Sequence, residues 1–313
     1  MNQEILYNKE EQCQLDKNGF VIIDFIDQSI VNRLIQDPNL KNLGFLIKEY
    51  KYLTSAHEKD IKLRKDISNR IFKEVQDAFN KKIKNYTIFG SIFGNKKAHL
   101  QSFVTPHHEW SIVDEDKYRV YDLWVPLVDI NLKNGPLFML PRSQYGVHYK
   151  VNRPINTPCF FNDFEEDVKK NSVPILMKAG QGLLFNQSLI HFSTPNYSSK
   201  DRPCIMIAFK DIDAKDNYIY HKDGIYINKY KVPNNFTYDI HDFLNIDISK
   251  IKDAQLVEQS IEKEQITIDK NIFSKMLHSS DIKLKYNYKY IKIYFSFLHI
   301  FSFIRNKITK FKN

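Results

Sequence analysis

The residues of this sequence best suited to metal chemistry are His107 and Glu109, which are separated by one residue. On a β-strand, side chains two positions apart project from the same face, so one metal ion could bind both groups. Two imidazoles and one carboxylate form a facial ligand set that leaves positions on iron(II) open for oxygen chemistry. The spacing therefore suggests an oxidative metal site, to be completed by a histidine distant in the sequence.

This spacing also arises by chance, so it needs support from its surroundings. Ten histidines and 37 acidic residues in a chain of 313 give about one such match at random, and the chain has two. The second match joins His221 to Asp223. The dipeptide Asp223-Gly224 predicts a hairpin turn, and a turn accounts for an Asp at this position without a metal. Arg305 is the only arginine after His221. The second match therefore has no nearby guanidinium for an anionic co-substrate, and the first is favoured.

Several short motifs surround the favoured pair. In chain order they are Thr105-Pro106-His107-His108-Glu109-Trp110-Ser111, Leu123-Trp124-Val125-Pro126-Leu127-Val128-Asp129, Asn134-Gly135-Pro136-Leu137, Ala179-Gly180-Gln181-Gly182-Leu183-Leu184-Phe185, and His191-Phe192-Ser193-Thr194-Pro195-Asn196 followed by Arg202. Over roughly residues 15 to 212, the chain resembles the phytanoyl-CoA dioxygenase-like family of iron(II)/2-oxoglutarate oxygenases. Several motifs in one order are more specific than any single motif.

This resemblance implies the cofactors and the site residues. The implied cofactors are Fe(II), 2-oxoglutarate as co-substrate, and O₂. The implied metal ligands are His107, Glu109 and His191. The implied co-substrate residues are Arg202, which would bind the distal carboxylate of 2-oxoglutarate, and Ser193 and Trp124 beside it. A guanidinium suits this task because it can donate two parallel hydrogen bonds to one carboxylate.

The sequence departs from the family pattern at two places. Glu109 stands where the family usually has Asp, which keeps the carboxylate and adds one methylene. Pro141-Arg142-Ser143-Gln144 stands where Pro-Gly-Ser-His is usual, and this change affects no implied metal ligand. Because Glu109 occupies the position that halogenating relatives leave to a small residue, we expect oxygenation or another non-halogenating oxidation.

The elements that must position these residues are mostly short strands. Apolar or alternating runs separated by Gly, Pro and Asn occur at residues 86–93, 100–104, 118–128, 137–140, 175–178, 182–185 and 203–209. Such runs suggest a sandwich or barrel, and the resemblance implies a double-stranded β-helix, that is, a cupin-like jelly roll. An N-terminal strand at 19–26 and amphipathic helices at 29–35 and 61–79 precede them. The predicted fold class is mainly β with flanking helices.

We predict a single oxygenase domain over residues 1–281. Its jelly-roll core covers about 86–212, preceded by the strand and supporting helices of 1–85 and followed by a C-terminal Tyr-rich hairpin and helices over 213–281, where 250–281 is predicted to be helical. The irregular polar stretch 145–173 is either a lid over the site or a surface loop, and both interpretations stay open. A separate tail covers 282–313.

The tail carries eight basic residues and no acid, whereas the remaining 281 residues carry a net charge of only +1. The body thus has no basic face for nucleic acid, which excludes it as an expected partner. The tail predicts an amphipathic helix over about 290–311 with Ile293, Tyr294 and Phe297 on its apolar face. That face would either pack on the body or a second subunit, or lie in a membrane interface. The stretch free of Lys and Arg is too short for a membrane span.

Composition favours an intracellular protein. Three widely spaced cysteines (Cys13, Cys159 and Cys204) argue against a disulfide framework, and the N-terminus lacks a cationic region followed by an apolar run. We therefore expect a cytoplasmic location, or one peripheral to a membrane.

The expected function is hydroxylation of a C–H bond in a small molecule with release of succinate and CO₂. The alternatives are a desaturase or epimerase outcome, a non-catalytic jelly-roll binding protein, and a cupin enzyme that does not use 2-oxoglutarate.

Overall fold

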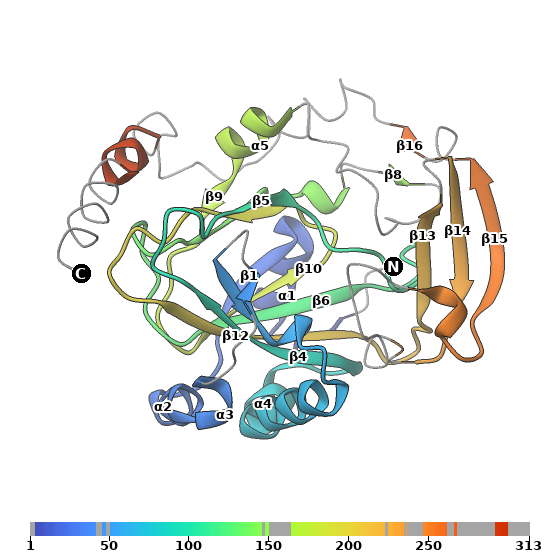
Figure 1. The fold of residues 1–313 in the computed structure, drawn as a ribbon, viewed down its shortest axis with the longest axis horizontal. Helices are drawn as coiled ribbons and strands as arrows, with labels where there is room; N and C mark the ends of the chain where they lie inside the picture. Colours follow the sequence, from blue (N-terminus) through green and yellow to red (C-terminus); the bar gives the residue numbers. More distant parts are fainter. Residues whose placement is uncertain are drawn as a thin grey trace.

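The structure is a computed structural model that describes residues 4–41, 46–47, 51–145, 148–149, 164–222, 225–234, 236, 247–261, 266–267 and 292–299. In these residues the chain forms mainly antiparallel β-sheets with helices on the outside (Figure 1). Two of the sheets face each other as a double-stranded β-helix, the jelly roll that was predicted.

The larger sheet has seven strands. In spatial order they are β1 (Phe20–Asp24), β10 (Gln181–Asn186), β6 (Val120–Pro126), β12 (Arg202–Asp211), β4 (Tyr86–Lys96), β3 (Tyr52–Thr54) and β2 (Leu46–Ile47). All seven residues of β6 are buried. A strand buried on both faces reads as a continuous apolar run, which is why Asp122 within β6 is unusual.

The smaller sheet has four short strands and faces the larger one. In spatial order they are β5 (Val104–His107), β11 (His191–Ser193), β7 (Leu137–Met139) and β9 (Val173–Pro174). Side chains from both sheets form one apolar cluster that includes Trp124, Met139, Leu183 and Cys204. The two sheets are thus held together by a core from which polar site residues emerge.

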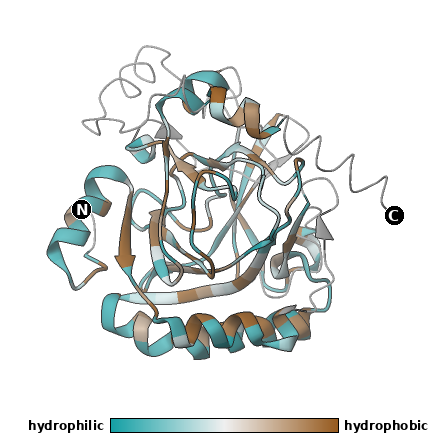
Figure 2. Cartoon of the chain, turned by 90° about the vertical axis from the view of Figure 1, so that its left-hand side faces the viewer, coloured by the Kyte–Doolittle hydropathy of each residue, from teal (hydrophilic) through white to brown (hydrophobic). Residues whose placement is uncertain are grey.

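Helices cover the outer face of the larger sheet, as Figure 1 shows for α2, α3 and α4. The helices of the body are α1 (Lys9–Asn18), α2 (Gln28–Gln36), α3 (Pro38–Lys41), α4 (Ile61–Lys82) and α5 (Glu165–Asn171) in the described residues. The Asp60 side chain caps α4 by accepting hydrogen bonds from two backbone N–H groups. Every fourth residue from 67 to 79 is apolar and buried, namely Ile67, Ile71, Val75 and Phe79. The helix therefore has one apolar face and one polar face, and both kinds of residue are visible along it in Figure 2.

Three 3₁₀ turns and two smaller sheets complete the described elements. The turns are η1 (Ser55–His57), η2 (Ser143–Tyr145) and η5 (Ile248–Lys250). The remaining strands are β13 (Asn217–Lys222), β14 (Tyr226–Lys231) and β15 (Gln255–Ile261), which form one sheet, and β8 (His148–Tyr149) with β16 (Ile266–Thr267), which form a pair.

The C-terminal part differs from the prediction. The Tyr-rich hairpin is confirmed by the pairing of β13 with β14, although its turn at 223–224 lies outside the described residues. Tyr218 is buried and packs near Tyr230 and Phe236, so these rings contribute to a local apolar core. The helix predicted for 250–281 is wrong in its described part, because β15 pairs with β14 as a third strand.

Some of the earlier boundaries were also wrong. Most of the predicted elements are nevertheless confirmed in their essentials. They are the strands at 19–26, 86–93, 118–128, 137–140, 182–185 and 203–209 and the helices at 29–35 and 61–79. The predicted strand at 100–104 instead begins at Val104, and that at 175–178 is replaced by β9 and one isolated bridge at Met177. The stretch 145–173 contains α5, so its described part is not irregular throughout.

The described part of the tail, residues 292–299, forms a helix that lies beside the smaller sheet (Figure 1). It packs through Phe295, which joins the ring pair of Phe138 and Phe192. Ile293, Tyr294 and Phe297 are instead exposed. The face predicted to be apolar is therefore not the face that packs on the body.

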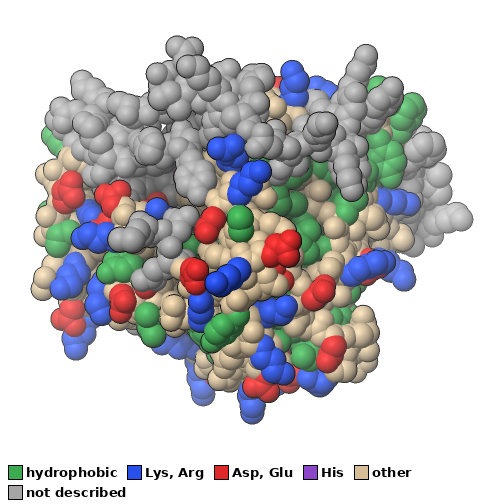
Figure 3. All heavy atoms as spheres, turned by 180° about the vertical axis from the view of Figure 1, so that it is seen from behind, with side chains coloured by type: hydrophobic (Ala, Val, Ile, Leu, Met, Phe, Trp, Pro, Cys, Tyr) green, Lys and Arg blue, Asp and Glu red, His purple; other side chains and the backbone are tan. Residues whose placement is uncertain are grey.

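The charges of the body are mixed. In the described part of the face seen in Figure 3, Lys and Arg side chains alternate with Asp and Glu, in keeping with the low net charge outside the tail. No helix in the described ranges is long and apolar enough to cross a membrane.

Candidate metal and co-substrate site

Three of the residues singled out in the sequence converge at the end of the smaller sheet. His107 ends β5, His191 begins β11, and the two are direct partners in the antiparallel pairing of these strands. Glu109 follows two residues after β5. Its Oε1 atom lies 3.5 Å from the Nε2 atom of His107 and 3.7 Å from that of His191. The ligand atoms of all three residues lie within 4.8 Å of one another, which is close enough for one ion to bind them together.

The hydrogen bonds of the two histidines leave the correct nitrogen for a metal. His107 Nδ1 lies 2.8 Å from the backbone oxygen of Thr105, and His191 Nδ1 lies 2.9 Å from that of Leu189. A carbonyl oxygen can only accept, so each Nδ1 must carry the proton and donate it. Each neutral ring then has its lone pair on Nε2, which points to the shared carboxylate. Backbone acceptors of this kind orient metal-binding histidines in many sites.

The electrostatics of the three residues are linked. Burial, with a further effect from neighbouring His107, lowers the pKa of His191 to about 4, so this ring is neutral at pH 7. Burial would raise the pKa of Glu109, but the hydrogen bond and charge of His107 lower it to about 2. Burial likewise opposes protonation of His107, yet Glu109 raises its pKa. The set is therefore an ionised carboxylate with imidazoles beside it, which suits a divalent cation.

Arg202 lies on the other sheet, at the start of β12, and only 2% of it is exposed. Its Nη1 donates to the backbone oxygen of Gly135 at 2.6 Å, and its guanidinium carbon lies 5.0 Å from the ring centre of Trp124. The Nε atom of Arg202 is buried and has no hydrogen-bond partner within the described structure. A buried donor without an acceptor costs free energy, so this atom marks a place for an acceptor that the described residues do not supply.

Lys96 is one residue of the site that sequence reasoning missed. It ends β4 and is the direct partner of Arg202 in the pairing of β4 with β12. The side chain is fully buried, and its Nζ donates to Ser193 Oγ at 2.7 Å, to the backbone oxygen of Thr194 at 3.0 Å, and to that of Ser102. Burial, followed by the charge of Arg202, lowers the pKa of Lys96 well below its ordinary value. The sequence offered only a weak signal, a lysine three residues after the predicted strand at 86–93, and its place opposite Arg202 comes from the strand register.

Asp122 is a second residue missed from sequence. It lies in β6, two residues before Trp124, and is fully buried. Gln187 Nε2 donates to its Oδ1 at 3.1 Å, while its Oδ2 atom is buried and has no hydrogen-bond partner among the described atoms. Burial, and then the charge of Glu109, raise the pKa of Asp122 well above its usual range. An acid inside an apolar strand was its sequence signal.

The site is divided between the two sheets. The histidines belong to the smaller sheet, and Arg202, Trp124 and Lys96 belong to the larger one. Ser193 connects the two groups, because it lies two residues after His191 and accepts from Lys96. All six residues predicted for the site are thus gathered in one region. His108 is not one of the three residues whose ligand atoms are grouped, and Trp110 packs against the cluster that contains Tyr218.

A jelly roll with two histidines and one carboxylate converging beside buried cations defines the class of mononuclear non-haem iron proteins. The donor set fits iron, and the orphaned Nε of Arg202 fits an anionic co-substrate such as 2-oxoglutarate. Comparison with known proteins gives the family. The model of the phytanoyl-CoA dioxygenase family matches residues 16–204, which is more than half of the chain, and the protein belongs to this family.

Curated relatives agree with that assignment. A phytanoyl-CoA dioxygenase of Arabidopsis thaliana is 32% identical over 137 residues, which cover 42% of this chain and 48% of the relative. The phytanoyl-CoA dioxygenase domain-containing protein 1 of Bos taurus is 29% identical over 143 residues, with 41% and 48% covered. The chain thus spans about half the length of the curated relatives it matches.

The chain is also similar to solved structures of low sequence identity. The non-haem α-ketoglutarate-dependent carbocyclase SnoK from nogalamycin biosynthesis is 17% identical, with a TM-score of 0.49 and coverage of 67% of this chain and 86% of that one. HygX from Streptomyces hygroscopicus, with nickel, 2-oxoglutarate and hygromycin B bound, is 14% identical, with a TM-score of 0.44 and coverage of 66% and 88%.

Proposed function

We propose that this protein is an Fe(II)/2-oxoglutarate-dependent oxygenase that oxidises a C–H bond of a small molecule. One observation carries the proposal: Lys96 and Arg202 are neighbouring buried basic side chains, and the described residues form no ion pair between either of them and an acid. A buried charge that lacks a counter-charge is costly. A dicarboxylate that binds the metal at one end and these basic side chains at the other would supply the missing negative charge. 2-Oxoglutarate is such a dicarboxylate.

Each residue then has a role. His107, Glu109 and His191 would hold the iron through two Nε2 atoms and a carboxylate oxygen. Arg202 would bind the distal carboxylate of the co-substrate, with Trp124 restricting the guanidinium. Lys96, whose three N–H donors are taken by Ser193, Thr194 and Ser102, would contribute its charge nearby. When bound, iron and 2-oxoglutarate supply the oxidising chemistry, which consumes O₂ and releases succinate and CO₂. The protein contributes the positions of these groups.

The product follows from the substrate and not from the metal ligands. Hydroxylation is the outcome that needs the fewest additional groups, and we propose it first. Desaturation or epimerisation would use the same site with a different substrate pose. The carboxylate of Glu109 would occupy the third protein ligand position, so halogenation is not part of the proposal.

The test compares two buried cations with one exposed neighbour. Arg202→Met and Lys96→Met are expected to weaken 2-oxoglutarate binding by about 2 to 5 kcal/mol, the range for removing one partner of a buried charge pair, while iron binding changes little. Lys97→Met is the matched control, because Lys97 pairs with Asp201 at a half-exposed position, and it should bind 2-oxoglutarate as the native protein does. Calorimetric titration of the metal-loaded protein measures the affinity.

Succinate release in the presence of Fe(II), 2-oxoglutarate and O₂ measures turnover. The native protein and Lys97→Met are expected to release succinate slowly even without a second substrate. Tight binding of 2-oxoglutarate without any succinate would instead support a binding protein. An affinity unchanged in both Arg202→Met and Lys96→Met would contradict the proposed binding mode.

A further inference from the structure

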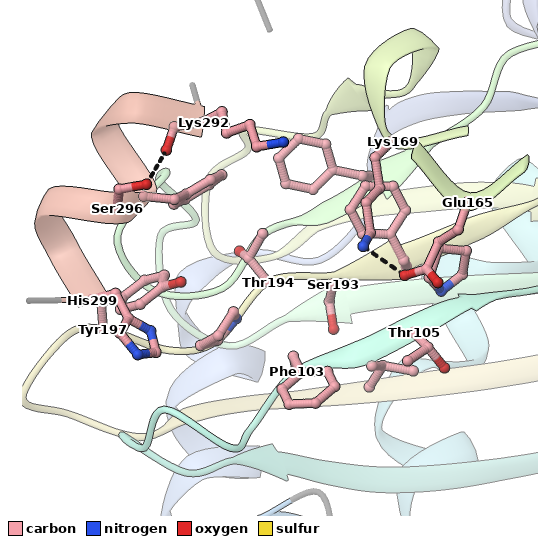
Figure 4. Close-up of a pocket in the computed structure, with 16 residues that line it drawn as sticks. Phe103, Thr105, Glu165, Lys169, Ser193, Thr194, Tyr197, Lys292, Ser296 and His299 are labelled. Atoms are coloured by element: carbon pink, nitrogen blue, oxygen red, sulfur yellow. Dashed lines mark hydrogen bonds and ion pairs between the residues drawn. The ribbon is translucent and has the colours of Figure 1, made fainter. Parts of the chain in front are cut away.

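The helix at 292–299 is fixed to the body by one of its faces. The Phe295 ring lies 6.2 Å from that of Phe138 in an edge-on arrangement and 5.8 Å from that of Tyr197 in a stacked one. Lys292 Nζ lies 3.2 Å from Glu166 Oε2. Figure 4 shows Lys292, Ser296 and His299 along this face, beside a cavity of about 590 Å³ that they line together with the outer side of the smaller sheet. The helix is therefore attached, and its orientation relative to the body is set.

The other face of this helix is apolar and exposed. The exposed fractions are 45% for Ile293, 40% for Tyr294 and 57% for Phe297. Single exposed apolar residues are ordinary, but three large ones on one helical face are a common mark of a binding surface. Because Phe295 already attaches the helix, packing on the body does not account for these three side chains. They form what we call the outer helix face.

The charge of the sequence on either side of the outer helix face restricts its partner. Residues 282–313 contain eight Lys and Arg and no Asp or Glu, whereas the rest of the chain has a net charge of +1. A second copy of the chain would bring two basic segments together, and the rest of that copy has a net charge of only +1 with which to balance them. A surface with many anionic groups and an apolar layer beneath them would match both the cations and the aromatic side chains.

We propose that the outer helix face binds the surface of an anionic lipid bilayer. Ile293, Tyr294 and Phe297 would enter the boundary between headgroups and acyl chains, while the basic residues before and after them contact lipid phosphates and carboxylates. Amphipathic helices with basic flanks and aromatic residues bind membranes in this way, lying in the plane of the interface. The attachment through Phe295 would hold the jelly roll at the membrane surface without a membrane span. This proposal does not depend on the proposed catalytic function.

The test uses the full chain and vesicles of two compositions. Vesicles of phosphatidylcholine with about one third phosphatidylserine are expected to co-sediment the protein, and vesicles of phosphatidylcholine alone are not. Binding should weaken strongly between about 0.1 M and 0.5 M salt, because the charges involved are exposed to solvent. Equal sedimentation with both kinds of vesicle, or with neither, would overturn the proposal.

A variant with Ile293→Ser, Tyr294→Ser and Phe297→Ser tests the apolar part. It is expected to bind the anionic vesicles about tenfold or more weakly. The matched control replaces three exposed apolar residues elsewhere, Ile212→Ser, Leu256→Ser and Val257→Ser, and should bind as the native chain does. Thermal unfolding of both variants shows that they fold.

Light scattering detects the competing case, in which the outer helix face is a protein interface. If the first variant changes a dimer into a monomer and vesicle binding is unaffected, the proposal is wrong.

Discussion

Two histidines of the same site titrate differently because their surroundings differ. His107 lies beside Glu109, whose hydrogen bond and charge outweigh burial and raise its pKa, whereas burial dominates at His191 and lowers its pKa. The pair can therefore be distinguished by pH before any metal is added. Their shifts also have opposite effects on stability, in different pH ranges.

The metal-free protein is expected to lose stability as the pH falls from about 6.5 to about 4. His191 binds a proton near its usual pKa of 6.5 when the chain is unfolded, but only near about 4 when it is folded. In this window the unfolded state holds more protons, so acid favours unfolding, by at most about 3 kcal/mol. The raised pKa of His107 affects stability above this window. It stabilises the folded state at low pH, and this stabilisation is lost as the pH rises above 6.5. Urea unfolding midpoints at several pH values measure the effect, and His191→Gln should remove the acidic step. Equal slopes for both proteins would contradict it.

Asp122 should destabilise the protein at neutral pH. Its pKa is raised when folded, so the unfolded chain releases this proton first and stability declines as the pH rises above the usual 3.8. Asp122→Asn keeps the shape and the acceptor for Gln187 and has no proton to lose. We expect this variant to be more stable than the native protein at pH 7, by about 1 kcal/mol or more. Asp129→Asn, in which the lost carboxylate pairs with Lys178 at the surface, provides the control and should not stabilise. A less stable Asp122→Asn would disprove this account.

At the scale of elements, α4 supports the sheet that carries the cations. Phe79 is fully buried and makes edge-on contacts with Phe25, Phe72, Tyr86 and Phe209. Phe79→Ala is expected to lower the free energy of unfolding by about 3 to 5 kcal/mol, through lost transfer energy and the cavity left behind.

Chemical denaturation measures the effect of Phe79→Ala. A change at an exposed position of the same helix, Lys81→Ala, is the comparison and should stay within about 0.5 kcal/mol. A loss below about 1 kcal/mol in Phe79→Ala would mean that the surrounding side chains close the space.

The strands and helices were predictable where periodicity is strong, as in β6 and α4. The start of β5 was misplaced because Thr105-Pro106-His107 has little strand propensity, and Pro is tolerated there since β5 is the edge of its sheet. The strand β15 was missed because pairing with β14 outweighs its polar, helix-compatible sequence. Lys96 could not be placed at the site from sequence, because only the register of β4 against β12 puts it opposite Arg202.

Across the whole molecule, burial is uneven, and local stability should follow it. Every residue of β6 is buried and its neighbours on both sides are strands, whereas β15 is an edge strand whose residues 255–259 are all exposed. Amide hydrogen exchange should therefore be slowest in β6 and faster by several orders of magnitude in β15. Mass spectrometry of peptides from both strands measures it, and similar protection of the two would contradict the expected order.

The division of the site between the two sheets has a mechanical consequence. The histidines belong to the smaller sheet, and Lys96 and Arg202 belong to the larger one, so an ion bound to the first group and an anion bound to the second form a bridge across the interior. A bridge of this kind resists separation of the sheets only when both of its parts are present. The force needed to part the two layers of the jelly roll should therefore rise little with the metal alone and most when metal and dicarboxylate are bound together.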